Sequence, residues 1–216
     1  MEFLNWVRGP GLEYATVIFL VGILMRFLEM WLIGRKPDLS RPRASASRAG
    51  WRAVWRRSLP SEGLMKNSPL VMIAGYVFHI GFLLVLLFYV PHIHFFKDVL
   101  GFGWSGLPTP VINFLSILTI AALVALLIHR LIDPVRRFLS TSQDYIVWAV
   151  TTLPVVTGYM AMHMDVMPYT TMLALHILSV EILMVVFPFT KLMHAFTFAV
   201  SRYYNGAAMG RKGVQL

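Results

Sequence analysis

The stretch HILSVEILMVVFPFTKLMH, residues 176–194, is a long apolar segment with a histidine at each end. His176 and His194 are eighteen positions apart, which on one α-helix is five whole turns. Both imidazoles would then leave the helix on the same side, about 27 Å apart along its axis. The hydrocarbon core of a bilayer is roughly 30 Å thick. One membrane helix would therefore place an imidazole near each face, as two haems stacked across a membrane require.

The composition indicates which solvent surrounds the chain. Hydrophobic residues make up 57% of its 216 residues, more than a soluble protein of this length can bury, so lipid must cover much of the surface. Cysteine is absent, which excludes structural disulfides, thiolate iron–sulfur ligation and covalent c-type haem. A redox cofactor would have to be held by His or Met. The net charge of +9 comes without a soluble domain or an aromatic reading platform, so no nucleic-acid partner is expected.

Five apolar runs predict an all-α integral membrane protein, a five-helix bundle forming a single membrane domain. The expected spans are about 12–33, 69–91, 108–130, 145–163 and 170–198. Sixteen of the nineteen Lys and Arg residues fall on one predicted side, nine of them in the loop 34–68. By the positive-inside rule this loop and the C-terminus are cytoplasmic and the N-terminus is outside. The loop segment WRAVWRR, residues 51–57, suggests contact with anionic lipid, a docked partner, or only a solvated topology signal.

The second span repeats the pattern of the fifth. His79 lies about a third of the way along it, and His92 and His94 follow Pro91 at its far end. If Pro91 only kinks the helix, His79 and His92 are about 20 Å apart along the axis. The second helix would rise from the cytoplasm and the fifth would return to it.

Four histidines therefore form two pairs. His79 and His194 lie toward the cytoplasm, and His92 and His176 lie toward the outer face. Each pair can supply two axial imidazoles to one b-type haem iron, and filled axial positions suit electron transfer rather than oxygen binding. His94 and His163 are reserve ligands for the outer haem. The alternative is that these histidines only hydrogen-bond between helices.

Further polar residues near the outer helix ends are quinone-site candidates: Lys97, Asp98, His94 and His163. Each can equally be an ordinary loop residue. Glu181 would point away from the haem side of its helix, at ~100° per residue, and is either a proton relay or a buried acid bonded to a neighbouring helix.

Three segments carry a family resemblance: FHIG at 78–81, RLIDPVRRFLSTSQDY at 130–145, and the fifth helix from Leu175 to His194. With the five-helix layout, they resemble the gamma subunit of respiratory nitrate reductase and related membrane cytochromes b, including the sulfite-reduction-associated DsrM type. The resemblance covers most of the chain after Pro69. It is most specific in the fifth helix, where the histidine spacing and the FPFTKLMH ending both match.

The resemblance implies a subunit with two haems b that exchanges electrons between quinone and a cytoplasmic iron–sulfur or molybdoenzyme-type partner, in the cytoplasmic membrane of a prokaryote. By this carry-over His79, His176 and His194 occupy ligand positions. The family places its remaining ligand ten residues after the first, and Tyr89 stands there in this chain. His92 or His94 must then substitute, or the outer haem is bound differently or is missing.

Such a chain would be the quinone-reactive subunit of a larger oxidoreductase rather than an enzyme by itself. Two functions of other classes compete with this expectation. One is a haem-free membrane anchor or assembly subunit, whose histidines only join helices. The other is a proton-coupled transporter using Glu181 and His176, which the absence of an inverted repeat disfavours.

Overall fold

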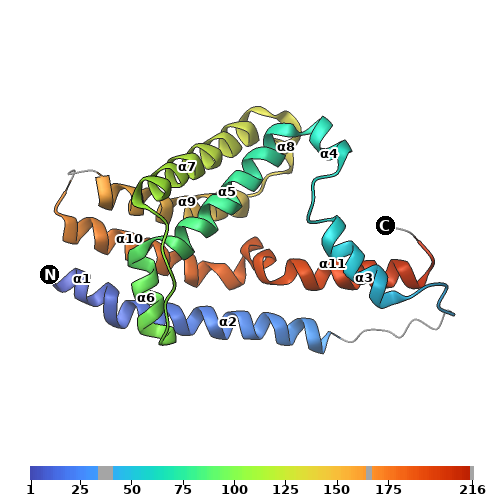
Figure 1. Cartoon of the computed structure of the whole chain (residues 1–216), viewed down its shortest axis with the longest axis horizontal. Helices are drawn as coiled ribbons and strands as arrows, with labels where there is room; N and C mark the ends of the chain where they lie inside the picture. Colours follow the sequence, from blue (N-terminus) through green and yellow to red (C-terminus); the bar gives the residue numbers. More distant parts are fainter. Residues whose placement is uncertain (34–40, 164–166, 215–216) are drawn as a thin grey trace. The chain divides into compact units, whose positions relative to one another are not determined.

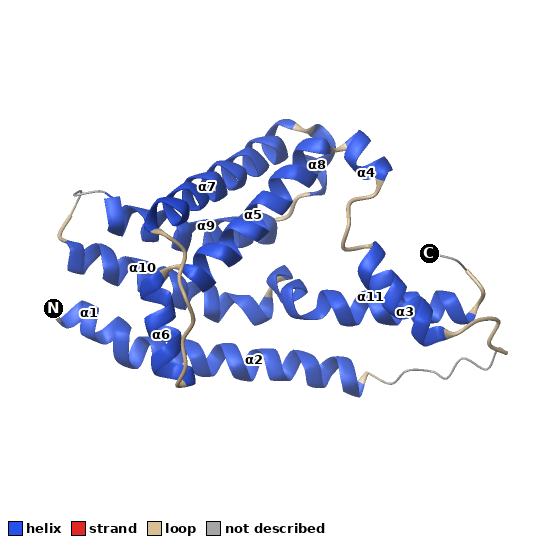
Figure 2. Ribbon diagram, in the orientation of Figure 1, coloured by secondary structure: helices blue, strands red, loops and turns tan. Residues whose placement is uncertain are grey.

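The computed structural model describes residues 1–33, 41–163 and 167–214, and these form helices and no strand (Figure 1, Figure 2). Part of the predicted basic loop, residues 34–40, lies outside the described residues. The chain divides into two compact units. Unit 1 comprises Met1–Ile18 and Pro69–Val186, and unit 2 comprises Phe19–Ser68 and Phe187–Leu216.

Unit 1 contains eight of the helical elements within the described residues. They are α1 (Glu2–Trp6), the π-helical turn η1 (Val7–Gly11), α5 (Pro69–Phe88), α6 (Val90–Leu100), α7 (Thr109–Ile132), α8 (Pro134–Leu139), α9 (Ser142–His163) and α10 (Tyr169–Val186). Neighbours in sequence pack on one another: α5 on α7, α7 on α9, α9 on α10. The N-terminal turns add a further layer, because Leu4 and Val7 pack on Ala174 of α10.

Unit 2 is built from α3 (Ala46–Arg56), α4 (Glu62–Asn67), the 3₁₀ turns η2 (Phe187–Phe189) and η3 (Lys191–Met193), and α11 (His194–Arg211). It also contains all but the first turns of α2 (Leu12–Leu32). Phe19 of α2 packs edge-on against Phe187 and Phe196. Ser45 caps the N-terminus of α3 and Ser61 that of α4, so each helix begins where a hydroxyl accepts a free backbone N–H.

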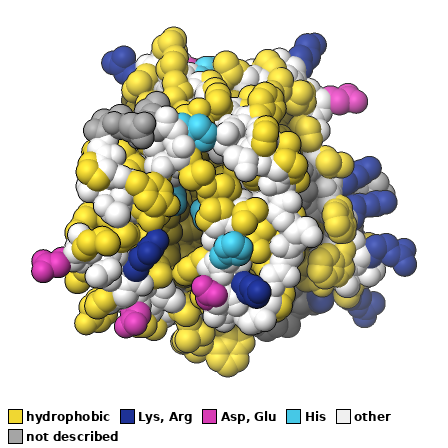
Figure 3. Space-filling model, turned by 60° about the vertical axis from the view of Figure 1, so that its left-hand side comes forward, with side chains coloured by type: hydrophobic (Ala, Val, Ile, Leu, Met, Phe, Trp, Pro, Cys, Tyr) yellow, Lys and Arg dark blue, Asp and Glu magenta, His cyan; other side chains and the backbone are white. Residues whose placement is uncertain are grey.

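Within the described residues, five helical segments are long and apolar enough to cross a membrane: Glu2–Leu32, Pro69–Phe88, Thr109–Ile132, Ser142–His163 and Tyr169–Phe189. The prediction of a five-span, all-α membrane protein is confirmed at this level. Apolar side chains cover much of the face in Figure 3. In water such a surface would be unfavourable, so lipid contacts it. The orientation of the termini stays a prediction.

The second span ends earlier than expected, and this corrects the helix arithmetic for His79 and His92. Tyr89 is extended (φ −76°, ψ 126°) and serves as the N-cap of α6, with Pro91 in the first turn of that helix. Proline fits a first turn because the N–H it lacks would be unpaired there anyway. Pro91 therefore starts a new helix rather than kinking an old one, and His92 and His94 belong to α6.

The fifth span is also interrupted, so His176 and His194 do not share one continuous helix as the spacing suggested. Pro188 lies in η2, and Thr190 is extended (φ −129°, ψ −179°) before η3 and α11 begin. Proline removes a helical hydrogen bond and clashes with the preceding turn, which explains the break. Arg26 donates from Nε to the Pro188 carbonyl at 2.9 Å and so satisfies a polar group at the interruption.

Candidate haem-binding site

His92 is fixed against the end of α5 by the turn at Tyr89. Its Nδ1 lies 3.2 Å from the Val85 carbonyl, and its ring meets the Tyr89 ring edge-on with centres 5.2 Å apart. Burial lowers the pKa of His92 below its ordinary value, and the hydrogen bond to Val85 offsets part of that shift. Burial thus favours the neutral form of the imidazole, which is the form that binds a metal.

His176 lies on α10 and faces α9. Its Nδ1 is 3.3 Å from the Thr157 hydroxyl, which also lies 2.7 Å from the Leu153 carbonyl. With the Thr157 hydroxyl donating to Leu153, its oxygen accepts from His176 Nδ1–H. A Cβ added at Gly158 would fall 3.0 Å from His176 Cε1, so only glycine lets the ring lie this close to the α9 backbone. Thr157 and Gly158 together fix the position of the His176 imidazole against α9.

The imidazole rings of His92 and His176 lie close together within unit 1. Their centres are 6.2 Å apart and their planes are 15° from parallel. A metal ion bound axially between two imidazoles imposes about 6 Å between ring centres, because each metal–nitrogen bond is ~2 Å long and the nitrogen stands about 1 Å from the centre of its ring. The separation of the two ring centres is therefore the one that axial ligation by two imidazoles requires.

The kind of metal centre follows from the number of ligands. No group of three or more His, Asp or Glu in the described residues can hold a metal ion. Two imidazoles alone leave a transition metal underligated unless its other positions are already filled, as they are by the four nitrogens of a porphyrin. In metal sites the second ring nitrogen of the histidine usually donates to a carbonyl or hydroxyl, and Val85 and Thr157 offer such acceptors here. The residues present fit an axial haem site.

His94 takes a different place from His92. It lines an open recess of about 260 Å³ beside α6, whose walls are Val90, Ile93, His94, Lys97, Gly103, Trp104 and Gly106. The indole Nε1 of Trp104 donates to the Leu87 carbonyl at 2.7 Å, which holds the loop after α6 in place. Of the quinone-site candidates, the recess thus brings together His94 and Lys97.

The remaining quinone-site candidates lie elsewhere. Asp98 is exposed on α6 and is not among the residues lining the recess. His163 ends α9, where its ring stacks on Tyr159 with centres 4.4 Å apart and its Nδ1 lies 3.1 Å from the Tyr159 carbonyl. His163 is also exposed, and it is not part of the His92–His176 pair.

His79 and His194 belong to different units, so each is described within its own. His79 is exposed on α5 and its Nδ1 contacts the Gly75 carbonyl at 2.6 Å. His194 is exposed at the start of α11 and its Nδ1 contacts the Lys191 carbonyl at 2.7 Å. Both rings have the Nδ1 contact typical of metal-ligating histidines, although His163 has it too. Their pairing stays a prediction.

Glu181 is buried on α10 and faces the N-terminal helix break rather than any haem-ligand candidate. A Cβ at Gly11 would come within 2.9 Å of Glu181 Oε1, so the missing side chain makes room for the carboxyl group. Oε1 has no hydrogen-bond partner in the described part of the chain. The sequence alternative of an acid bonded to a neighbouring helix is therefore not seen at this oxygen.

One curated protein matches nearly the whole chain. It comes from Nitratidesulfovibrio vulgaris (strain Hildenborough), its description is simply "Protein", and it is 31% identical over 205 residues, which are 91% of this chain and 89% of the relative. The two chains belong to one family. No family model matches, and no solved structure matches significantly. The family membership itself names no activity.

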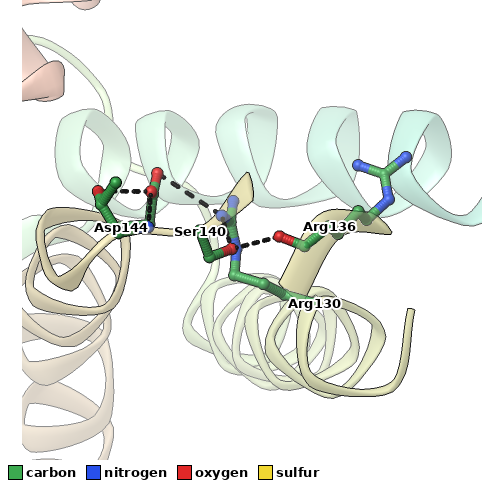
Figure 4. Close-up of polar contacts among 5 residues, drawn as sticks. Arg130, Arg136, Ser140 and Asp144 are labelled. Carbon is green, nitrogen blue, oxygen red and sulfur yellow. Dashed lines mark hydrogen bonds and ion pairs between the residues drawn. The ribbon is translucent and has the colours of Figure 1, made fainter. Parts of the chain in front are cut away.

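The segment of residues 130–145 contains a group of hydrogen bonds and an ion pair that connect α7, α8 and α9 (Figure 4). Arg130 donates from Nη1 to the Ser140 hydroxyl at 2.9 Å and lies 3.5 Å from Asp144 Oδ1. Ser140 donates in turn to the Arg136 carbonyl at 2.7 Å. Asp144 Oδ2 accepts from the backbone N–H and from the hydroxyl of Thr141, immediately before the start of α9. This segment therefore sets the turn that aligns α7 with α9.

The contacts of His176 with Thr157 and Gly158 were not predicted from the sequence. The signal that could have found them is a small-residue pair in an apolar helix, because such pairs mark places where a neighbouring helix or ring approaches closely. Trp104, Gly103 and Gly106 were likewise only loop residues until the structure placed them around the recess.

Proposed function

We propose that this chain is the membrane cytochrome b subunit of a multi-subunit oxidoreductase in the cytoplasmic membrane of a prokaryote. In the proposal it carries electrons between the quinone pool and a cytoplasmic iron–sulfur or molybdoenzyme-type subunit. The observation that supports it most is the placement of His92 against His176, with both Nδ1 atoms occupied and ring centres 6.2 Å apart. A haem b held there would supply a one-electron redox centre whose axial positions are both filled.

The second haem of the proposal is the one predicted on His79 and His194. The proposed orientation keeps the N-terminus outside and the basic loop and C-terminus in the cytoplasm. The outer centre would then be the one on His92 and His176, and electrons would cross the membrane between the two centres. The direction of flow depends on the partner.

The recess beside α6 is the proposed quinone site. It opens on the α6 face that carries His94 and Lys97, and α6 also carries His92. Lys97 can donate a hydrogen bond to a quinone carbonyl oxygen, and a neutral His94 can accept a proton from a quinol hydroxyl. Oxidation of one quinol releases two electrons, which would pass one at a time to the outer redox centre, and two protons, of which His94 would take the first and water at the open side of the recess the second. The Trp104 indole, held by Leu87, would form an apolar wall for the headgroup ring.

The test is the haem content and the reduced-minus-oxidised absorption spectrum of the purified full-length chain. We expect two haem b per chain in the unchanged protein and one after His176→Ala or His92→Ala. His163→Ala is the matched control, because His163 is an exposed histidine with the same Nδ1-to-carbonyl contact. It should keep both haems.

A chain that inserts into the membrane but shows no b-type absorption band would overturn the proposal and favour a haem-free anchor. Unchanged haem content in both His92→Ala and His176→Ala would leave a cytochrome but reject this ligand pair. Membrane insertion is checked in each variant by the amount of chain recovered in the membrane fraction.

A further inference from the structure

The helix α3 of unit 2 has two faces of different chemistry. One face consists of small residues and packs on α11: Ala53 meets Gly206, and Ala49 meets Gly210. The opposite face, at steps of three and four residues, is formed by Arg48, Trp51, Arg52 and Trp55. Trp55 is 73% exposed and Trp51 58% exposed. The outward face thus combines two large aromatic rings with two guanidinium groups.

This face is held on a fixed support. A Cβ on Gly206 or Gly210 would clash with the α3 alanines, so the two helices are as close as their backbones allow. Trp51 also packs edge-on against Tyr203 of α11, with ring centres 5.3 Å apart. Beyond the end of α3, Arg202 donates to the Ser58 hydroxyl at 2.8 Å. Such a surface is already ordered, which lowers the entropy cost of binding a partner.

The position of α3 along α11 separates it from the end of the first span. The last turns of α2, up to Ile33, line a common recess with Thr190, Met193 and Thr197. The α3 contacts on α11 run from Tyr203 to Gly210, so they lie six to thirteen residues further along. Measured along the helix this is roughly 9–20 Å. The face of α3 therefore lies further along α11 than the residues that meet the end of the first span.

The charges around the face are of one sign. The sequence has no Asp or Glu from residue 39 to residue 61, nor from residue 194 to residue 212. Arg48 and Arg52 make no ion pair within the described residues. Arg and Trp are the residue types that contribute most to protein interfaces when buried by a partner.

We infer that the outward face of α3 docks a soluble protein through an acidic surface patch, with Trp55 and Trp51 as the apolar anchors and Arg48 and Arg52 as the charge contacts. The occupant is a protein with an acidic patch, because the face carries positive charge without a nearby acidic residue in its own sequence and exposes two Trp side chains of the kind that anchor protein interfaces. Only the redox character of that protein rests on the proposed function. The docking surface itself does not require a haem.

The test uses the full-length chain expressed in its own host, with the photo-crosslinking amino acid p-benzoylphenylalanine in place of Trp55. The control position is Gly63 on α4, whose surroundings are open. We expect one protein adduct at position 55 and none at position 63, with an acidic contact peptide identified by mass spectrometry. Arg48→Glu with Arg52→Glu should reduce the adduct at least tenfold. Changing the acidic residues of the contact peptide to Lys should restore it.

Three outcomes would overturn the inference: adducts with phospholipid only, no adduct at position 55, or an adduct that the Arg48→Glu, Arg52→Glu pair leaves unchanged. The same membranes are assayed for b-type absorption, which separates this inference from the proposed function. Docking without haem would reject the cytochrome and keep the surface. Haem without docking would keep the cytochrome proposal and reject the docking surface.

Discussion

The imidazole rings of His92 and His176 stand 6.2 Å apart, 15° from parallel, although the residues come from helices far apart in the sequence. Each ring is held through Nδ1 by a different neighbour, the Val85 carbonyl and the Thr157 hydroxyl. Both rings are therefore held in place through Nδ1, which leaves Nε2 of each ring as the ligand atom of the proposed haem site. Because each ring is held by its own neighbour, substitutions of these neighbours should each have a distinct effect on the proposed haem.

His92 and His94 should behave differently, although they are two residues apart. His92→Ala removes one imidazole of the pair and should cost one haem per chain. His94→Ala should keep the haem content and slow quinol-dependent reduction of the haem, because His94 lines the recess instead. Haem quantification and stopped-flow reduction by a soluble quinol measure the two effects. Equal haem loss in both variants would contradict the assignment.

Thr157 should affect the reduction potential of the proposed haem on His176 without being a ligand of its iron. Thr157→Val removes the hydroxyl acceptor of Nδ1–H while keeping the shape, which makes the ligand less basic and should raise the reduction potential of that haem. Loss of such a second partner typically weakens metal binding by about 10–100-fold. Thr157→Ser keeps the hydroxyl and should restore both values. Potentiometric titration checks this, and equal potentials in the Val and Ser variants would contradict it.

Gly158→Ala should lower haem content even though alanine favours helices. In an exposed helix interior, replacing Gly by Ala gains about 0.5–1 kcal/mol of stability. At residue 158 the new Cβ would lie 3.0 Å from His176 Cε1 and displace the ring from its present position relative to His92. Gly63→Ala is the control, since nothing lies within 4 Å of its added Cβ. The prediction is wrong if both variants keep full haem content.

Arg130→Ala should destabilise the turn between α7 and α9. It removes the hydrogen bond to Ser140 and the ion pair with Asp144, and because Arg130 is partly exposed the cost should be only about 0.5–1.5 kcal/mol. Arg137→Ala is the matched control, since Arg137 is exposed and makes no ion pair among the described residues. Thermal unfolding in detergent compares them. Similar melting temperatures in the two variants would show that the contacts of Arg130 do not stabilise this turn.

The membrane spans could be read from the sequence because hydropathy over about 20 residues is a local property. The second, third and fourth spans lie within about three residues of the predicted ranges, whereas the fifth ends at Phe189 instead of near residue 198. The first span begins earlier than expected, at Glu2, and Gly9 is non-helical (φ −107°, ψ −106°) within it. Arg8 and Pro10 hid this start from a composition argument, because both residues are typical of helix boundaries.

By itself, the sequence determined that the chain is too apolar to be covered by water, that it has five helices long and apolar enough to cross a membrane, and that no cysteine could hold a redox metal. It could not determine which imidazoles meet. The spacing of His176 and His194 assumed a straight helix, and Pro188 and Thr190 end it between them. The choice between His92 and His94 depended on the turn at Tyr89, which folds α6 back onto Val85. Helical periodicity reports only local geometry, whereas the facing of two side chains from different helices is decided by how the backbone breaks and how the helices pack.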